Sequence, residues 1–167
     1  MKILAPNLYK IILTNKNMRT SSRNLYIIKG SERSLMIDTS WNVPECLSEM
    51  EQALNELSID CRNLDIFVTH NHVDHSGYVS FFTDRGARAF MNPVEIAASS
   101  DRYHRFYEDN DMRRSYTSEV GVTKERTPDA WQEIKAGADQ LARDNNVNFD
   151  FPFTPIAPGD RLSYGGY

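Results

Sequence analysis

Three histidines and an aspartate fall within one six-residue stretch, as His70, His72, Asp74 and His75. Residues two apart in an extended segment point to the same side, so His70 and His72 are predicted to aim their imidazoles at one ion. Asp74 and His75 come as the chain turns toward the next helix, which redirects their side chains to a neighbouring position. Neutral imidazole and carboxylate together suit zinc, iron or manganese. The stretch from Thr69 to Gly77 is therefore predicted to be a binding loop for catalytic metal ions.

A purely structural metal site is less favoured. Closed zinc sites more often use cysteine ligands, and no suitable cysteine lies near the cluster. Cys46 and Cys61 do not form a CxxC arrangement and are predicted to be reduced thiols with no metal role. The fourth histidine, His104, is predicted to be a surface or packing residue on a helix and is not assigned as a ligand.

The elements that must position the loop are predicted from hydrophobic periodicity and turn residues. The predicted strands are Leu8 to Thr14, Asn24 to Lys29, Leu35 to Asp38, Asp65 to Thr69 and Ala87 to Met91, with helices after Pro44, through Val79 to Phe82, and from Pro93. Phe149, Phe151 and Phe153 alternate as in extended chain, and Arg161 to Tyr164 is predicted to start another strand. The order indicates an α/β layer whose sheet is covered at least in part by helices. The metal loop leaves a strand at its carboxyl end, where ligands gather in open α/β sheets.

Residues 108–146 are polar and charged, with thinly spaced apolar residues. This segment is predicted to be a helical excursion from the sheet core rather than a separate domain. A surface helix pair that packs on its own protein, a lid over the site and a dimer arm all remain open.

The composition is that of a soluble globular protein, with 167 residues, 40% hydrophobic and 25% charged. A formal net charge of −4 and the lack of a basic stripe argue against nucleic-acid binding. No stretch approaches the roughly 20 apolar residues of a membrane span, and the N-terminal apolar run is too short for a signal peptide. A cytoplasmic protein without a membrane partner is therefore expected.

The sequence resembles the metallo-β-lactamase superfamily, and within it the glyoxalase-II-like and lactonase-like hydrolases. The matching residues are His70, His72, Asp74 and His75 with Ser76 and Gly77, the strand from Leu35 to Thr39 with its aspartate, Asn24 to Ile28, and Pro158 to Leu162. The resemblance implies the N-terminal half of an αββα sandwich, with a mixed β-sheet covered by helices.

For the site, the resemblance implies that His70 and His72 hold the first of two zinc ions and that Asp74 and His75 hold the second, with iron or manganese also possible. A bridging water, its pKa lowered by the metals, would be the nucleophile, and Asp74 could orient it or shuttle its proton. Asp38 would be a supporting residue that steadies the metal loop. The alternative for Asp38 is a cap on the turn that follows at Thr39 and Ser40.

The family completes its site with a third histidine, a bridging aspartate and a final histidine further along the chain. Here the sequence ends roughly where the strand before that third histidine should begin, so residues 1–167 are expected to form a single, truncated domain with partial or empty metal occupancy. The exposed sheet face of such a half is expected to promote a homo-oligomer or an intertwined dimer.

The function expected from the resemblance is hydrolysis of an ester, thioester or lactone by metal-bound hydroxide, impaired or absent in this chain alone. His72 disfavours the diiron oxidoreductase branch, which usually has glutamate there. A mononuclear-iron sulfur dioxygenase shares the H-x-H-x-D-H pattern and is an alternative. A non-catalytic metal-binding fragment that acts by oligomerisation is another. The small-molecule substrate cannot be identified from the sequence.

Overall fold

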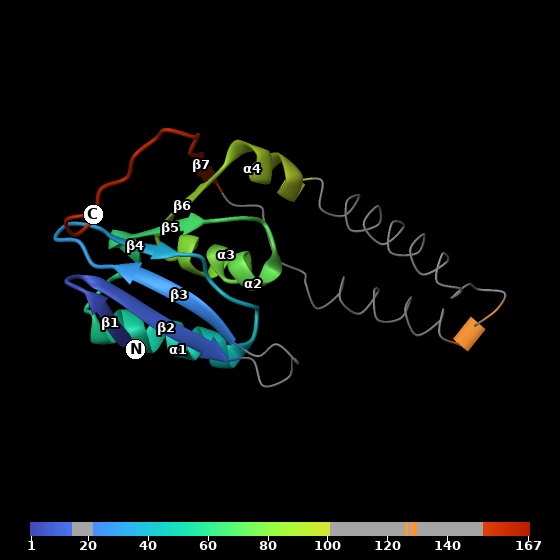
Figure 1. Ribbon diagram of the computed structural model, residues 1–167, viewed down its shortest axis with the longest axis horizontal. Coiled ribbons are helices and arrows are strands. Elements are labelled where there is room, and N and C mark those ends of the chain that lie inside the picture. Colours follow the sequence, from blue (N-terminus) through green and yellow to red (C-terminus); the bar gives the residue numbers. More distant parts are fainter. Residues whose placement is uncertain (15–21, 101–125, 127, 130–151) are drawn as a thin grey trace. The chain divides into compact units, whose positions relative to one another are not determined.

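The computed structural model describes residues 1–14, 22–100, 126, 128–129 and 152–167 (Figure 1). The chain divides into two compact units, Met1–Ala97 with Val147–Tyr167, and Ala98–Asn146. The predicted helical excursion at 108–146, apart from Arg126, Pro128 and Asp129, lies outside the described residues, as does His104.

A seven-stranded mixed sheet forms the centre of the first unit, in the part of the chain that is described. Its strands are β1 (Lys2–Ala5), β2 (Leu8–Thr14), β3 (Ser22–Ile28), β4 (Ser34–Ile37), β5 (Leu64–Val68), β6 (Arg88–Met91) and β7 (Phe153–Pro155). The strands lie side by side in chain order. β1 to β4 pair antiparallel, whereas β4 to β7 pair parallel. The change at β4 follows from connection length, because a short connection is enough for antiparallel strands, whereas parallel strands need a crossover of a dozen or more residues.

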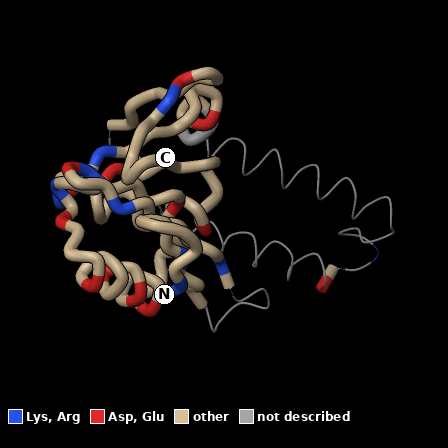
Figure 2. The backbone as a smooth tube through the Cα atoms, turned by 60° about the vertical axis from the view of Figure 1, so that its left-hand side comes forward, with Lys and Arg blue, Asp and Glu red and all other residues tan. Residues whose placement is uncertain are grey.

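Helices supply these crossovers and cover one face of the sheet (Figure 1). They are α1 (Pro44–Glu56), the short 3-10 helix η1 (Cys61–Asn63), α2 (Val73–Ser76), α3 (Val79–Thr83) and α4 (Pro93–Ser100). Pro44 stands in the first turn of α1, where its missing N–H costs nothing. Acidic side chains lie along the whole length of α1, and this helix carries no lysine or arginine (Figure 2).

The core lies between this sheet face and the helices. Strand residues at every second position point into it, and α1 and α3 contribute from the other side. Its fully buried side chains include Leu13, Leu25, Ile27, Met36, Met50, Leu64, Ile66, Val68, Val79, Phe82 and Met91. Both cysteines are unpaired, as predicted, and Cys46 is part of this core.

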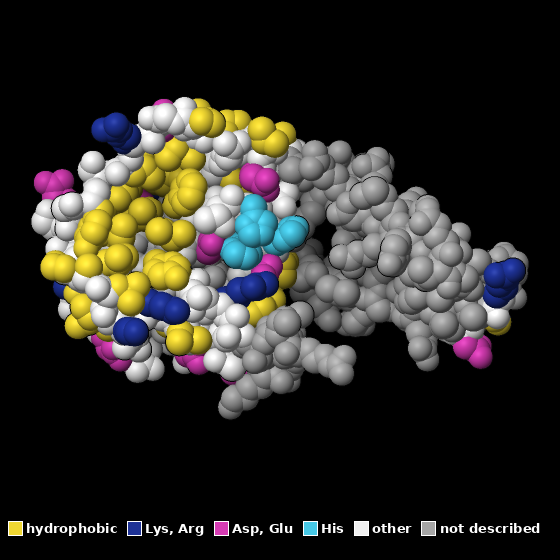
Figure 3. Space-filling model, viewed as in Figure 1, with side chains coloured by type: hydrophobic (Ala, Val, Ile, Leu, Met, Phe, Trp, Pro, Cys, Tyr) yellow, Lys and Arg dark blue, Asp and Glu magenta, His cyan; other side chains and the backbone are white. Residues whose placement is uncertain are grey.

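The opposite face of the sheet is also apolar. Register places Tyr26 beside Ile37 and Ile37 beside Phe67, which in turn faces Phe90. Ile12 on β2 is 57% exposed. Hydrophobic side chains gather on this face next to the histidines (Figure 3). The described residues thus form a sheet with one packed face and one open apolar face.

The predicted α/β class and mixed sheet are confirmed, but two details differ. β1 was not predicted: it is a short edge strand whose Ile3 is 70% exposed, so no buried alternation marks it in the sequence. It pairs with β2 through a tight turn in which Asn7 has a φ of 60°. The strand predicted at Arg161 to Tyr164 was wrong, since this segment forms no strand. Tyr164 instead donates a hydrogen bond from its hydroxyl to Asp65, and Gly165 follows at a φ of 57°. Phe149 and Phe151 lie outside the described residues, while Phe153 begins β7.

Candidate metal centre

The predicted metal loop follows directly from the carboxyl end of β5. His72 has an extended backbone with φ −66° and ψ 145°, and α2 begins at the next residue. The helical turn is closed by His75 N–H donating to the carbonyl of His72 at 2.9 Å. His72 therefore lies on extended chain and Asp74 and His75 lie on the turn, as predicted, whereas His70 lies in a bend after β5 and not on an extended segment.

The three histidine rings lie close together. The ring centroids of His70 and His75 are 4.1 Å apart, and those of His70 and His72 are 4.6 Å apart. The rings form one compact group on the surface beside the open sheet face (Figure 3). Burial, together with repulsion from His75 and His72, lowers the pKa of His70 below its usual value. The neutral imidazole, which is the form that binds a metal, is favoured at neutral pH.

Asp38 connects β4 to the loop. Its carboxylate accepts hydrogen bonds from the backbone N–H of Thr69 at 2.7 Å and from the Thr69 hydroxyl at 2.9 Å. It also lies 2.8 Å from Nδ1 of His75. A carboxylate at this nitrogen selects the tautomer with the proton on Nδ1, which leaves the Nε2 lone pair of His75 free. These contacts favour support of the metal loop over a cap on the turn at Thr39 and Ser40.

The loop packs tightly against the segment that follows β4. Thr39 donates hydrogen bonds to the carbonyl of His75 from its backbone N–H at 2.7 Å and from its hydroxyl at 3.0 Å. A Cβ on Gly77 would lie 2.4 Å from the carbonyl oxygen of Ser40. Gly77 has an ordinary helical φ of −59°, so close backbone approach, and not an unusual turn, requires glycine here.

Sequence reasoning missed two charged residues that contact the loop. Glu95 of α4 accepts a hydrogen bond from the backbone N–H of Asn71, which lies between His70 and His72, at 2.9 Å. Arg23 of β3 forms an ion pair with Asp74 through Nη2 and Oδ2. Neither residue belongs to a local sequence motif, because the tertiary arrangement of the strands and helices is what brings each of them next to the loop.

The donor set suits a divalent metal in kind, since three imidazoles and a carboxylate are the usual ligands of zinc and iron. Among the described residues, however, no three histidine, cysteine or acidic side chains are arranged so that they could hold an ion together. Asp74 Oδ2 lies 3.6 Å from Nε2 of His75 and is also paired with Arg23. The candidate ligands are thus gathered, but they do not converge on one point.

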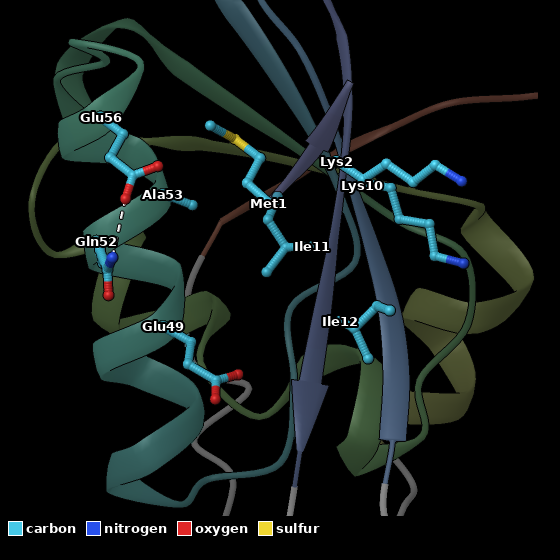
Figure 4. A pocket seen from close by; sticks show the side chains of 9 residues that line it. All are labelled: Met1, Lys2, Lys10, Ile11, Ile12, Glu49, Gln52, Ala53 and Glu56. Carbon is cyan, nitrogen blue, oxygen red and sulfur yellow. Dashed lines mark hydrogen bonds between the residues drawn. The ribbon is translucent and has the colours of Figure 1, made fainter. Parts of the chain in front are cut away.

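A different hollow opens beside the edge strands. It has a volume of about 360 Å³ and lies between α1 and the strands β1 and β2 (Figure 4). Lys2, Lys10, Glu49 and Glu56 contribute charged side chains to its lining. None of the candidate metal ligands lines this hollow, so it is separate from the metal loop.

A second charged cluster lies at the amino end of β5. Asp65 is fully buried and accepts hydrogen bonds from Arg33, Arg88 and the hydroxyl of Tyr164. Burial alone would raise the pKa of Asp65, but these hydrogen bonds outweigh it and hold the pKa at about 2. Burial and the bond to Asp65 also raise the pKa of Tyr164. The cluster joins β4, β5, β6 and the C-terminal segment at the end of the sheet opposite the histidines.

Comparison with known proteins identifies the fold. No family model matches the chain, and no curated protein matches it. Among solved structures, it is similar to a metallo-β-lactamase family protein from Thermus thermophilus, with a TM-score of 0.67 and 24% identity over 98% of this chain and 50% of that one. It is also similar to a β-lactamase domain protein from Burkholderia ambifaria, with a TM-score of 0.69 and 16% identity over 97% of this chain and 45% of that one.

The chain therefore has the metallo-β-lactamase fold, as the resemblance implied, and spans about half the length of these two proteins. No helix among the described residues is long and apolar enough to cross a membrane.

Proposed function

We propose that this chain, which has the metallo-β-lactamase fold, carries the first part of a metal-dependent hydrolase site for an ester, thioester or lactone. The observation that carries the proposal is the group of three imidazole rings at the carboxyl end of β5, with His75 oriented by Asp38. Ligand sites in open α/β sheets lie at this end of the strands.

Each residue has a distinct part in this proposal. His70 and His72 hold a first ion, and Asp74 with His75 faces a second position. Asp38 fixes the His75 ring through Nδ1, and its bonds to Thr69 hold the start of the loop against β4. When bound, a divalent metal supplies Lewis-acid polarisation of the substrate carbonyl and an acidic water. Asp74 lies on the helical turn and would accept a proton from that water.

We propose that turnover by this chain alone is slow. His70, His72 and His75 are the only histidines among the described residues. A catalytic zinc site typically uses three protein ligands and keeps one position open. With two ligands at each position, metal affinity is expected to be weak and water activation incomplete.

Zinc binding and turnover test the proposal together. The 167-residue chain should bind zinc and hydrolyse a thioester or lactone slowly, while the double variant His70→Ala, His72→Ala should lose both. The variant His104→Ala changes the fourth histidine and should behave like the unchanged chain. Stoichiometric zinc retained by the double variant would show that the ligands are assigned wrongly.

A mononuclear-iron sulfur dioxygenase is the second candidate. The ion pair between Arg23 and Asp74 favours it, because that pair leaves the imidazoles as the uncommitted donors for a single ion. Metal analysis after expression with iron and zinc, followed by oxygen consumption with a persulfide, separates the two functions. Metal binding without either activity would instead support a non-catalytic metal-binding protein.

A further inference from the structure

Arg23 stands at the side of the metal loop that would face a second ion. It lies near the start of β3, and its guanidinium pairs with Oδ2 of Asp74. The Asp74 side chain is only 15% exposed, so this pair is partly withdrawn from water. Salt screens such a pair less than it screens a fully exposed one.

The guanidinium is held in this position by more than Asp74. Its Cζ lies 5.4 Å from the ring centroid of Trp41, which is itself buried. Stacking of this kind suits the planar arginine head. Within the described part of the chain, Nε of Arg23 is buried and makes no hydrogen bond, so this end of the guanidinium packs against the protein, although the whole side chain is 42% exposed.

The position of Arg23 has an electrostatic consequence for a second metal ion. Asp74 Oδ2 lies 3.6 Å from Nε2 of His75 and also pairs with the guanidinium of Arg23. Arg23 therefore contacts the same carboxylate oxygen that, together with His75, would bind a second ion. Arginine stays charged at all ordinary pH values. A divalent cation at Asp74 and His75 would have to displace this fixed positive charge or tolerate its repulsion.

We infer that Arg23 acts as a built-in cation in place of the second metal, so that this chain binds one ion at His70 and His72 and not two. The inference rests on the proposed metal-binding function and narrows it to a mononuclear site. Arg23 is a positioning residue here, because it acts on the metal through Asp74.

Zinc stoichiometry tests the inference without reference to catalysis. The unchanged chain, Arg23→Gln and Arg62→Gln would be titrated with zinc against a chromophoric chelator, and zinc would be counted by elemental analysis after dialysis. Arg62→Gln is the matched control because it removes the same charge from an exposed side chain that pairs with Asp60. We expect one equivalent of zinc for the unchanged chain and for Arg62→Gln, and two equivalents for Arg23→Gln, whose affinity for the second ion should be at least about tenfold higher than that of the unchanged chain.

A double-mutant cycle shows whether the effect passes through Asp74. Arg23→Gln should add a second equivalent of zinc in the native background but not in the Asp74→Asn background. If Arg23→Gln fails to fold, as judged by circular dichroism, Arg23→Met keeps the packing on Trp41 and gives the same comparison. Two equivalents in the unchanged chain, or one equivalent in both Arg23→Gln and Arg23→Met, overturns the role of Arg23 alone. No zinc in any variant overturns both this inference and the proposed function.

Discussion

The carboxylate of Asp38 lies 2.8 Å from Nδ1 of His75, although 37 residues separate them in the sequence. The contact exists because β4 and β5 are parallel neighbours, which brings their carboxyl ends to the same edge of the sheet. Asp38 N–H also donates to the carbonyl of Phe67 at 2.8 Å, so the backbone that carries this carboxylate is tied to the strand that carries the loop.

Asp38→Asn should weaken metal binding by about 10- to 100-fold, the usual effect of removing a partner that orients a ligand. Asn tolerates the left-handed backbone at this position, where φ is 63°, so the fold should be kept. Zinc titration of this variant measures the effect. Asp60→Asn, which alters an exposed carboxylate bonded to Arg62, is the control and should leave affinity unchanged. Equal affinities for both variants would contradict a supporting role for Asp38.

Gly77→Ala should destabilise the protein by about 2 kcal/mol, because overpacking forces backbone to shift. The added Cβ would lie 2.4 Å from the carbonyl of Ser40 and 2.8 Å from that of Val73. Urea unfolding measures the change. Since the α2 turn carries Asp74 and His75, zinc affinity should fall with stability. An unchanged unfolding midpoint would mean that the two segments are not packed as described.

Asp65 should make stability depend on acid. Its pKa is about 2 in the folded protein, against an ordinary value of 3.8, so the folded state favours the charged form. This stabilisation is present above about pH 4 and is lost as the pH falls toward 2. The difference between the unfolded and folded pKa values of Asp65 corresponds to about 2 kcal/mol of stability at neutral pH. Asp65→Asn should lower stability at pH 7 and flatten this part of the pH profile.

Urea unfolding at several pH values measures the Asp65 effect. Asp84→Asn, at an exposed residue after α3, is the control and should keep the wild-type profile. If the stability of Asp65→Asn depended on pH in the same way as that of the unchanged chain, the buried cluster around Asp65 would be excluded as the cause of the acid dependence.

The open sheet face predicts self-association, which remains a proposal for this chain. Ile12 lies on that face and is 57% exposed, whereas Val94 is 69% exposed on α4. Ile12→Lys should reduce the oligomer seen by size-exclusion chromatography with light scattering, and Val94→Lys should not, since a charge opposes burial only where an interface forms. A stable species of 19.2 kDa for the unchanged chain would end the proposal.

The local sequence was enough to predict the loop and most of the elements around it. The spacing of His70, His72, Asp74 and His75 predicted an extended segment followed by a helical turn. The turn and the extended His72 are observed, whereas His70 lies in a bend. The strands and helices with a buried face were predictable because burial imposes a period of two or about 3.6 on apolar residues.

Only the tertiary structure could reveal what surrounds the loop. Arg23, Thr69 and Glu95 contact loop residues or Asp38 through the order of strands and helices, which no local pattern encodes. The edge strand β1 escaped prediction because its exposed side chains show no periodicity. The sequence alone thus determined which residues are the candidate metal ligands, whereas strand order and register decided that Asp38 contacts His75 and that Arg23 is paired with Asp74.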